Sequence, residues 1–208
     1  MAEWADAHQA PLHAHVSEQP AENETCREAY GATPSELLEA AGATGPRFTA
    51  VHATHLEAED FPRLGQGGVC LCPTTERDLA DGIGPARGLL EAGASISIGT
   101  DSNAVIDPFE ETRAVEMDQR LATGERGVVG CGITPGAPAD LVTVGFDSVR
   151  MAGTARKDPA GSLLFAAGAA DVQRVMVAGE TIVAEGRHRQ VDVADELSAS
   201  IEAVEENS

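Results

Sequence analysis

Four residues have the types and the placement of a metal-dependent hydrolytic site. His15 and Glu18 share one segment of the chain, and His52 and Asp101 each follow a later apolar run. Histidine and aspartate are common zinc ligands, and zinc lowers the pKa of a bound water to about 7. A neighbouring glutamate can carry protons, and a second histidine can hydrogen-bond the reacting oxygen. A lone His-x-His in a strand is more often part of a polar face than of a metal site. Together with Glu18, His52 and Asp101, however, the set indicates a zinc hydrolase.

The elements that must position these residues alternate between strands and helices. Apolar runs predict strands at 12–16, 48–52, 69–71 and 95–98. Helical composition and end signals predict helices at 21–30, 34–41, 57–64, 85–92 and 107–121. Such alternation with short connections is typical of a parallel sheet covered by helices. Because the carboxyl ends of parallel strands meet at one edge, we expect the four side chains to converge there.

Local sequence signals indicate where a helix begins and where the domains end. The segment Thr33-Pro-Ser-Glu36 is a capping box that begins the helix at 34–41. The turn-rich segment 134–138 marks a boundary, and 171–177 with 180–184 predicts a hairpin that turns at Ala178-Gly179. The acidic C-terminal residues predict a helix with a frayed end. We therefore expect one domain at 1–127, a second at 128–190 and a tail at 191–208.

The composition argues against several classes of protein. The chain has 208 residues, of which 34 are acidic and 14 basic, and its net charge of −20 disfavours nucleic acid and anionic membranes as partners. There is no basic leader and no apolar run of about 20 residues, so we expect a cytoplasmic protein. Cys26, Cys70, Cys72 and Cys131 lack the spacing of a disulfide framework. Cys70 and Cys72 share one strand face, where packing is more common than metal ligation.

Several motifs resemble, in their order, the C-terminal half of the amidohydrolase superfamily. After His15 with Glu18, His52 and Asp101 come Pro135-Gly-Ala-Pro-Ala-Asp-Leu-Val142 and Val175-Met-Val-Ala-Gly-Glu-Thr-Ile-Val183. Within the superfamily, the chain resembles the formimidoylglutamate deiminases. That resemblance is carried by His13-Ala-His-Val-Ser-Glu-Gln19, Val51-His-Ala-Thr-His55 and Leu71-Cys-Pro-Thr-Thr-Glu76 with Asp81-Gly82.

The resemblance implies an α/β fold, the C-terminal half of a (β/α)8 TIM-type barrel (parallel strands 5 to 8) plus part of a small β-sandwich domain. Residues 1–127 would form the partial barrel, 128–190 the partial sandwich and 191–208 an acidic tail. It also implies a mononuclear zinc site with His15 and Asp101 as ligands, and with Glu18, His52 and Asp101 as catalytic residues. The implied reaction hydrolyses N-formimidoyl-L-glutamate, a small-molecule substrate, to N-formyl-L-glutamate and ammonia in histidine degradation.

Five further residues are candidates for substrate binding, namely His13, Gln19, His55, Thr75 and Glu76. His13 shares a face with His15 and either touches substrate or is an inert inward residue. His55 either lines the pocket or orients a loop. Thr75 and Glu76 follow a barrel strand, where substrate contact and a turn stabilised by local hydrogen bonds are both reasonable.

The resemblance also implies zinc ligands that this segment does not supply. In the superfamily two further histidines, arranged His-x-His, end the first barrel strand, and only Met1 to Pro11 precede the strand at 12–16. We therefore expect an incomplete ligand set and a missing N-terminal half. One alternative is another zinc aminohydrolase or deaminase. A second is a non-catalytic partial barrel that needs a partner half or forms a homo-oligomer, since unpaired strand edges invite association.

Overall fold

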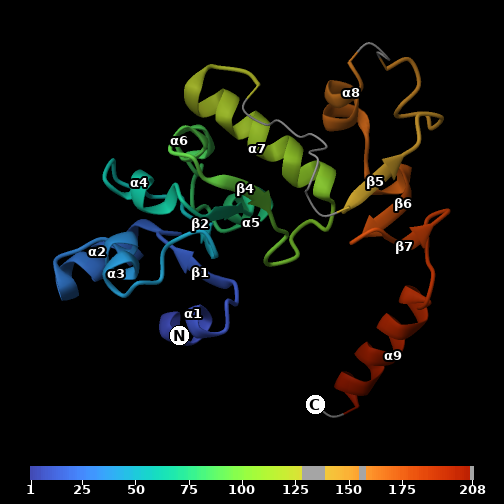
Figure 1. Ribbon diagram of the computed structural model, residues 1–208. Coiled ribbons are helices and arrows are strands. Elements are labelled where there is room, and N and C mark those ends of the chain that lie inside the picture. Colours follow the sequence, from blue (N-terminus) through green and yellow to red (C-terminus); the bar gives the residue numbers. More distant parts are fainter. Residues whose placement is uncertain (128–138, 155–157, 207–208) are drawn as a thin grey trace. The chain divides into compact units, whose positions relative to one another are not determined.

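The computed structural model describes residues 1–127, 139–154 and 158–206 (Figure 1). The chain divides into two compact units, Met1–Gly130 and Cys131–Ser208. The boundary expected at 134–138 and Cys131 both lie outside the described residues. Within the described residues, no helix combines the length and the apolarity of a transmembrane span.

A parallel sheet forms the centre of the first unit. Its strands are β1 (Leu12–Val16), β2 (Phe48–His52), β3 (Gly68–Leu71) and β4 (Ser95–Ile98), and they neighbour one another in chain order. Each pair is parallel, so the four carboxyl ends lie at one edge. The expected α/β class with a parallel sheet is confirmed.

Helices precede, connect and follow these strands. They are α1 (Ala2–Ala7), α2 (Pro20–Tyr30), α3 (Pro34–Ala40), α4 (Asp60–Leu64), α5 (Pro73–Asp78), α6 (Ala86–Glu91) and α7 (Pro108–Thr123). The Thr33 side chain accepts a hydrogen bond from the Glu36 N–H at 3.1 Å, so the expected cap of α3 is confirmed. Asp107 caps α7 by accepting from the Phe109 N–H at 2.9 Å. Helices α1 and α5 were not expected from the sequence.

The sheet has one apolar and one polar face because side chains alternate along a strand. On the apolar face Val16, Ala50 and Val69 are fully buried, and they form the core with the helix residues Leu64 and Leu89. The opposite face carries a row of neighbouring residues in register: His15, Val51, Cys70 and Ser97. The polar face is therefore the one that offers functional side chains.

The second unit is built on an antiparallel sheet. Its strands are β5 (Leu141–Val144), β6 (Val172–Val177), β7 (Glu180–Ala184) and β8 (Arg187–His188), in that order. The unit also contains α8 (Pro159–Ala166), a short 3-10 helix (Ala169–Asp171) and α9 (Val193–Glu205). Ala178 and Gly179 both have positive φ (49° and 84°), as a two-residue hairpin turn requires, so the expected hairpin is present.

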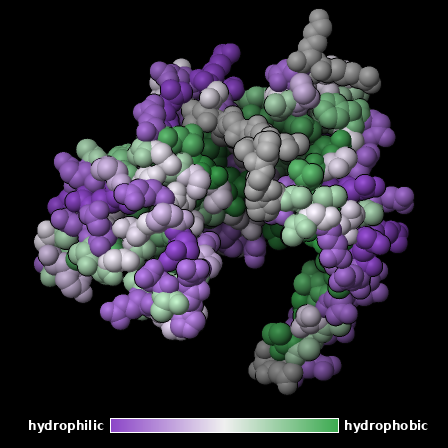
Figure 2. All heavy atoms as spheres, in the orientation of Figure 1, coloured by the Kyte–Doolittle hydropathy of each residue, from purple (hydrophilic) through white to green (hydrophobic). Residues whose placement is uncertain are grey.

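The hydropathy of the surface differs from one helix to another. Hydrophilic residues are frequent over α2, which has no buried residue, and over α3 (Figure 2). On α9 the apolar residues Val193, Leu197 and Ile201 are exposed, and apolar atoms are visible along this helix in Figure 2.

Candidate active site

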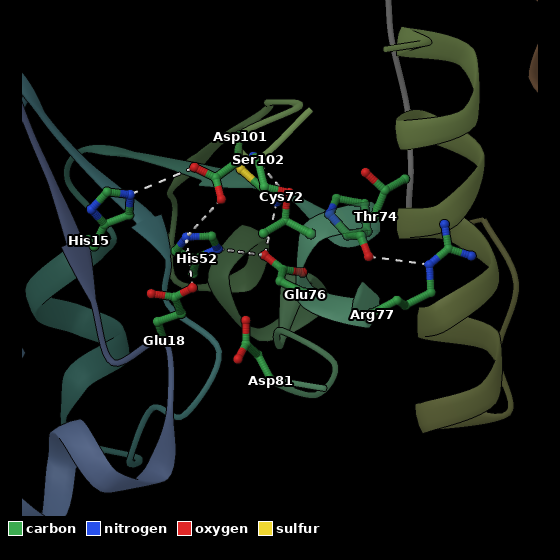
Figure 3. A network of polar contacts seen from close by, with 12 residues as sticks. His15, Glu18, His52, Cys72, Thr74, Glu76, Arg77, Asp81, Asp101 and Ser102 are labelled. Carbon is green, nitrogen blue, oxygen red and sulfur yellow. Dashed lines mark hydrogen bonds and ion pairs between the residues drawn. The ribbon is translucent and has the colours of Figure 1, made fainter. Parts of the chain in front are cut away.

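The four residues singled out in the sequence meet at the carboxyl edge of the parallel sheet (Figure 3). His15 Nε2 lies 3.9 Å from Asp101 Oδ1, and His52 Nε2 lies 4.0 Å from Asp101 Oδ2. Glu18 Oε1 lies 3.6 Å from His52 Nε2. The rings of His15 and His52 stack, with centroids 5.3 Å apart. Side chains from the ends of β1, β2 and β4 therefore form one cluster.

Unusual backbone geometry turns these side chains toward one another. Alternation alone would place His52 on the apolar face with Ala50, yet its ring stacks on that of His15. His52 has a φ of +68°, in the left-handed region, which breaks the alternation at the end of β2. Ser17, Ala53 and Asp101 also have positive φ, at 50°, 52° and 42°. Each left-handed conformation raises the free energy of the folded chain by about 1–3 kcal/mol and persists only when the surrounding structure holds it. Such conformations are common at functional sites.

Two carboxylates that the sequence analysis missed hold the segments around the cluster. Glu22, in the first turn of α2, accepts hydrogen bonds from the N–H groups of Ser17 and Glu18 at 2.9 and 2.8 Å. It therefore fixes the turn from which the Glu18 side chain projects. Glu111 of α7 accepts from both the N–H and the hydroxyl of Thr74. Acidic residues in a first helical turn were the only sequence signal for either role.

His52 is the most enclosed member of the cluster, with a side chain that is 0% exposed. Its Nδ1 donates to Glu76 Oε1 at 3.2 Å, while its buried Nε2 has no hydrogen-bond partner among the described residues. Burial pulls the pKa of His52 down, but the hydrogen bond to Glu76 and the charges of Glu18 and Asp101 outweigh it, so the pKa is raised. An unpartnered buried nitrogen points to a ligand or water at this place.

Glu18 has the environment of a proton carrier. Its side chain is 25% exposed, and burial raises its pKa above the ordinary glutamate value. The neighbouring His52 lowers this pKa and Asp81 raises it, with a net increase. A carboxyl group that keeps its proton to higher pH can deliver that proton to a leaving group.

The structure places the other candidate residues as follows. His13 is exposed on β1, on the same face as His15, and is not part of the cluster. The Gln19 amide donates to Asp81 Oδ1 at 2.8 Å, and the His55 ring nitrogen Nε2 donates to the Asp81 carbonyl at 2.6 Å. Both side chains therefore hold the loop after α5. Contact of any of these residues with substrate stays a prediction.

Thr75 and Glu76 are both buried, at 0% and 3% exposure. Thr75 contacts Ser102, and Glu76 contacts His52. Such enclosure favours a role within the protein over the direct substrate contact considered from the sequence. Cys26, Cys70 and Cys72 are free, and no cysteine joins a metal-ligating group in the part of the chain that the structure describes.

The cluster has the donor set of a zinc site. His15, His52 and Asp101 each offer one ligand atom, and these atoms lie within 4.8 Å of one another. Tetrahedral donors at about 2 Å from one zinc ion lie about 3.3 Å apart, so the two histidine–aspartate separations, 3.9 and 4.0 Å, would shorten by about half an ångström when zinc binds. The unpartnered Nε2 of His52 is independent support, because a cation or its water would satisfy that nitrogen.

Comparison with known proteins gives consistent matches. A model described as the amidohydrolase family matches residues 1–131. The 5-methylthioadenosine/S-adenosylhomocysteine deaminase of Pelotomaculum thermopropionicum is 32% identical over 93% of this chain and 50% of its own length. For two Pseudomonas aeruginosa proteins, 8-oxoguanine deaminase and formimidoylglutamate deiminase, the identities are 33% and 30%, over 93% and 86% of this chain and 48% and 46% of theirs.

Solved structures agree on the fold. An amidohydrolase from Brucella melitensis matches with a TM-score of 0.75 and 28% identity, over 93% of this chain and 49% of that one. The zinc complex of atrazine chlorohydrolase from Arthrobacter aurescens matches with a TM-score of 0.79 and 20% identity, over 96% and 50%. The chain thus spans about half the length of the proteins it matches.

Proposed function

The chain belongs to the amidohydrolase family, and from this premise we propose that it supplies the C-terminal half, strands 5 to 8, of the (β/α)8 barrel of a zinc-dependent hydrolytic deaminase. Residues 1–127 would be the partial barrel, 128–190 part of a β-sandwich domain and 191–208 an acidic tail. The observation that carries this proposal is the convergence of His15, Glu18, His52 and Asp101 at the carboxyl edge of a parallel sheet.

In the proposed reaction, water replaces an amino or imino nitrogen on a planar carbon, and ammonia leaves. Zinc held by His15 and Asp101 would supply acidity to the attacking water. Asp101 lies within 4.0 Å of both histidines and can accept the first proton released. Glu18, whose pKa is raised, delivers a proton to the departing nitrogen. His52 Nε2, at 3.6 Å from Glu18, orients the oxygen that adds to the carbon.

For the substrate we propose N-formimidoyl-L-glutamate. Support comes from the segment Leu71-Cys-Pro-Thr-Thr-Glu76 with Asp81-Gly82, and from the 30% identity with formimidoylglutamate deiminase. The second candidate is another zinc aminohydrolase, acting on an aminated purine or purine nucleoside. Its support is the 32–33% identity with the deaminases of methylthioadenosine and 8-oxoguanine.

Two protein ligands fall short of the three that catalytic zinc usually has, and we propose that the two histidines of a first-strand His-x-His join His15 and Asp101 in a set of four. The partner of this chain would then be the N-terminal half of the barrel, in the same polypeptide or a separate one. Such a half would also pair with the free edges of β1 and β4. A homo-oligomer is the alternative arrangement for these edges.

Ammonia release tests both the activity and the substrate. The zinc-loaded chain is assayed alone and mixed with the N-terminal half of the Pseudomonas aeruginosa formimidoylglutamate deiminase. We expect release from N-formimidoyl-L-glutamate only in the mixture, and only when Glu18 is intact. Release from methylthioadenosine or 8-oxoguanine instead would identify the second candidate, and no release from any of the three would favour a non-catalytic partial barrel.

A further inference from the structure

Thr75 and Glu76 are adjacent residues in α5, and each contacts the end of a different strand of the site. Glu76 reaches His52 at the end of β2, and Thr75 reaches the turn that carries Asp101 after β4. Both side chains are buried, and Glu76 points toward His52 (Figure 3). The two side chains therefore connect two strand ends of the site from inside the protein.

Glu76 determines which atom His52 presents to the cluster. Its Oε1 accepts from the Cys72 N–H at 2.9 Å and from His52 Nδ1 at 3.2 Å, so the carboxylate is itself held by the backbone. With Nδ1 engaged, Nε2 is the nitrogen that faces Glu18 at 3.6 Å and Asp101 at 4.0 Å. A carboxylate on one ring nitrogen fixes both the orientation of a histidine and the tautomer that it adopts.

Thr75 holds the backbone on the C-terminal side of Asp101. Its hydroxyl oxygen accepts from the Ser102 N–H at 3.2 Å and lies 3.0 Å from the Ser102 hydroxyl. It also lies 3.3 Å from the Thr100 carbonyl, on the other side of Asp101. Asp101 has a positive φ of 42°, so its conformation depends on such outside contacts.

The segment that carries these two residues is anchored from behind. Thr74 donates its N–H, at 3.2 Å, and its hydroxyl to the fully buried Glu111 of α7. The start of α5 is therefore fixed independently of its contacts with His52 and Ser102. A fixed segment can hold the two strand ends at a constant separation.

We propose that the Thr75–Glu76 pair is the positioning element of this site. Glu76 sets the ring of His52, Thr75 sets the turn of Asp101, and their adjacency sets the two side chains relative to each other. The inference rests on the proposed function only for its metal-binding readout. Its other readouts, the tautomer of His52 and the exchange of the Ser102 amide, do not depend on any activity.

Nuclear magnetic resonance of the full 15N-labelled chain tests the role of Glu76. At a pH well above the raised pKa of His52, where the ring is neutral, two-bond 1H–15N spectra identify which of its nitrogens carries the proton. We expect Nδ1–H in the wild type and in Glu76→Gln, because glutamine keeps the accepting oxygen. Glu76→Met removes that oxygen, so the preference for Nδ1–H should be lost.

Hydrogen exchange of the Ser102 amide tests the role of Thr75. Thr75→Val removes the acceptor with little change in shape, so this amide should exchange faster and zinc affinity should fall while the His52 tautomer is unchanged. Thr75→Ser keeps the hydroxyl and should restore both properties. Asp78→Asn, on the exposed part of the same helix, is the matched control and should change none of these readouts.

The proposal is overturned if the wild type carries Nε2–H on His52, if Glu76→Met keeps the Nδ1–H preference, or if Thr75→Val leaves Ser102 exchange unchanged. Should Glu76→Met not fold, the tautomers of the wild type and of Glu76→Gln decide the point. Absence of zinc binding in the wild type would count against the proposed metal site, while the tautomer and exchange measurements would still judge the positioning role.

Discussion

Removal of the Asp101 carboxylate should weaken zinc binding more than any other single loss of negative charge in this chain. Asp101 is the member of the cluster that approaches both histidines, at 3.9 Å from His15 and 4.0 Å from His52. Asp101→Ala deletes both of these oxygens and leaves the two rings facing an empty space. The two histidines alone are a weak zinc site.

The size of this effect follows from the ligand count. Zinc held by four protein ligands binds with about 10–16 kcal/mol, so one ligand contributes on average about 2.5–4 kcal/mol. Since each 1.4 kcal/mol is tenfold, this corresponds to a loss of roughly 100- to 1000-fold in affinity. Water can replace part of the lost coordination because the Asp101 side chain is 31% exposed. We therefore expect a loss near the lower value, roughly 100-fold.

Competition with a chromogenic zinc chelator measures the affinity directly. The chain carries a net charge of −20, so it attracts cations without any specific site. Asp78→Ala removes the same charge from an exposed position outside the cluster and controls for this general attraction. Equal zinc affinity of Asp101→Ala and Asp78→Ala would refute the cluster as the metal site.

Three further outcomes are expected. Glu18→Gln should leave zinc affinity unchanged but lower ammonia release by the reconstituted enzyme by about 100-fold, and an unchanged rate would mean that another group carries the proton. Leu89→Ala should lower the free energy of unfolding in urea by about 2–5 kcal/mol because this side chain is fully buried in the core, whereas its neighbour Leu90, 42% exposed, should tolerate alanine. Arg150, Ser148 and the Gly168 N–H lower the pKa of Asp171 to about 2, so Asp171 stabilises the second unit above pH ~4. That stability is lost as the pH falls toward 2, and Asp171→Asn should remove this part of the pH dependence measured by circular dichroism.

The sequence was sufficient for most strands and for the place where the site forms. Runs of apolar residues identified β1, β2 and β4 at their observed ends, because buried parallel strands need continuous apolar sequence. Since His15, His52 and Asp101 lie at or just after strand ends, parallel topology places them at the same edge of the sheet.

Other features depend on contacts that no local pattern reveals. Thr75 and Glu76 were expected on a loop after a barrel strand, yet the segment 73–78 folds as α5. Its stability comes partly from the pairing of Thr74 with Glu111, residues 37 positions apart in the chain. The orientation of the His52 ring toward His15 depends on a left-handed φ of +68°, a backbone conformation that nothing in the local sequence indicates.

The pairing of Thr74 with Glu111 couples the stability of the site to the stability of α7 against local unfolding. Proteins open in cooperative parts whose free energies lie below that of global unfolding. If α7 detaches, Thr74 loses the acceptor of both of its hydrogen bonds, and the start of α5 is released along with Thr75 and Glu76. The amides of α5 and α7 should therefore exchange with deuterium at a common opening free energy. Damage to α7 would then disable the cluster from a distance, without any change in the residues that compose it.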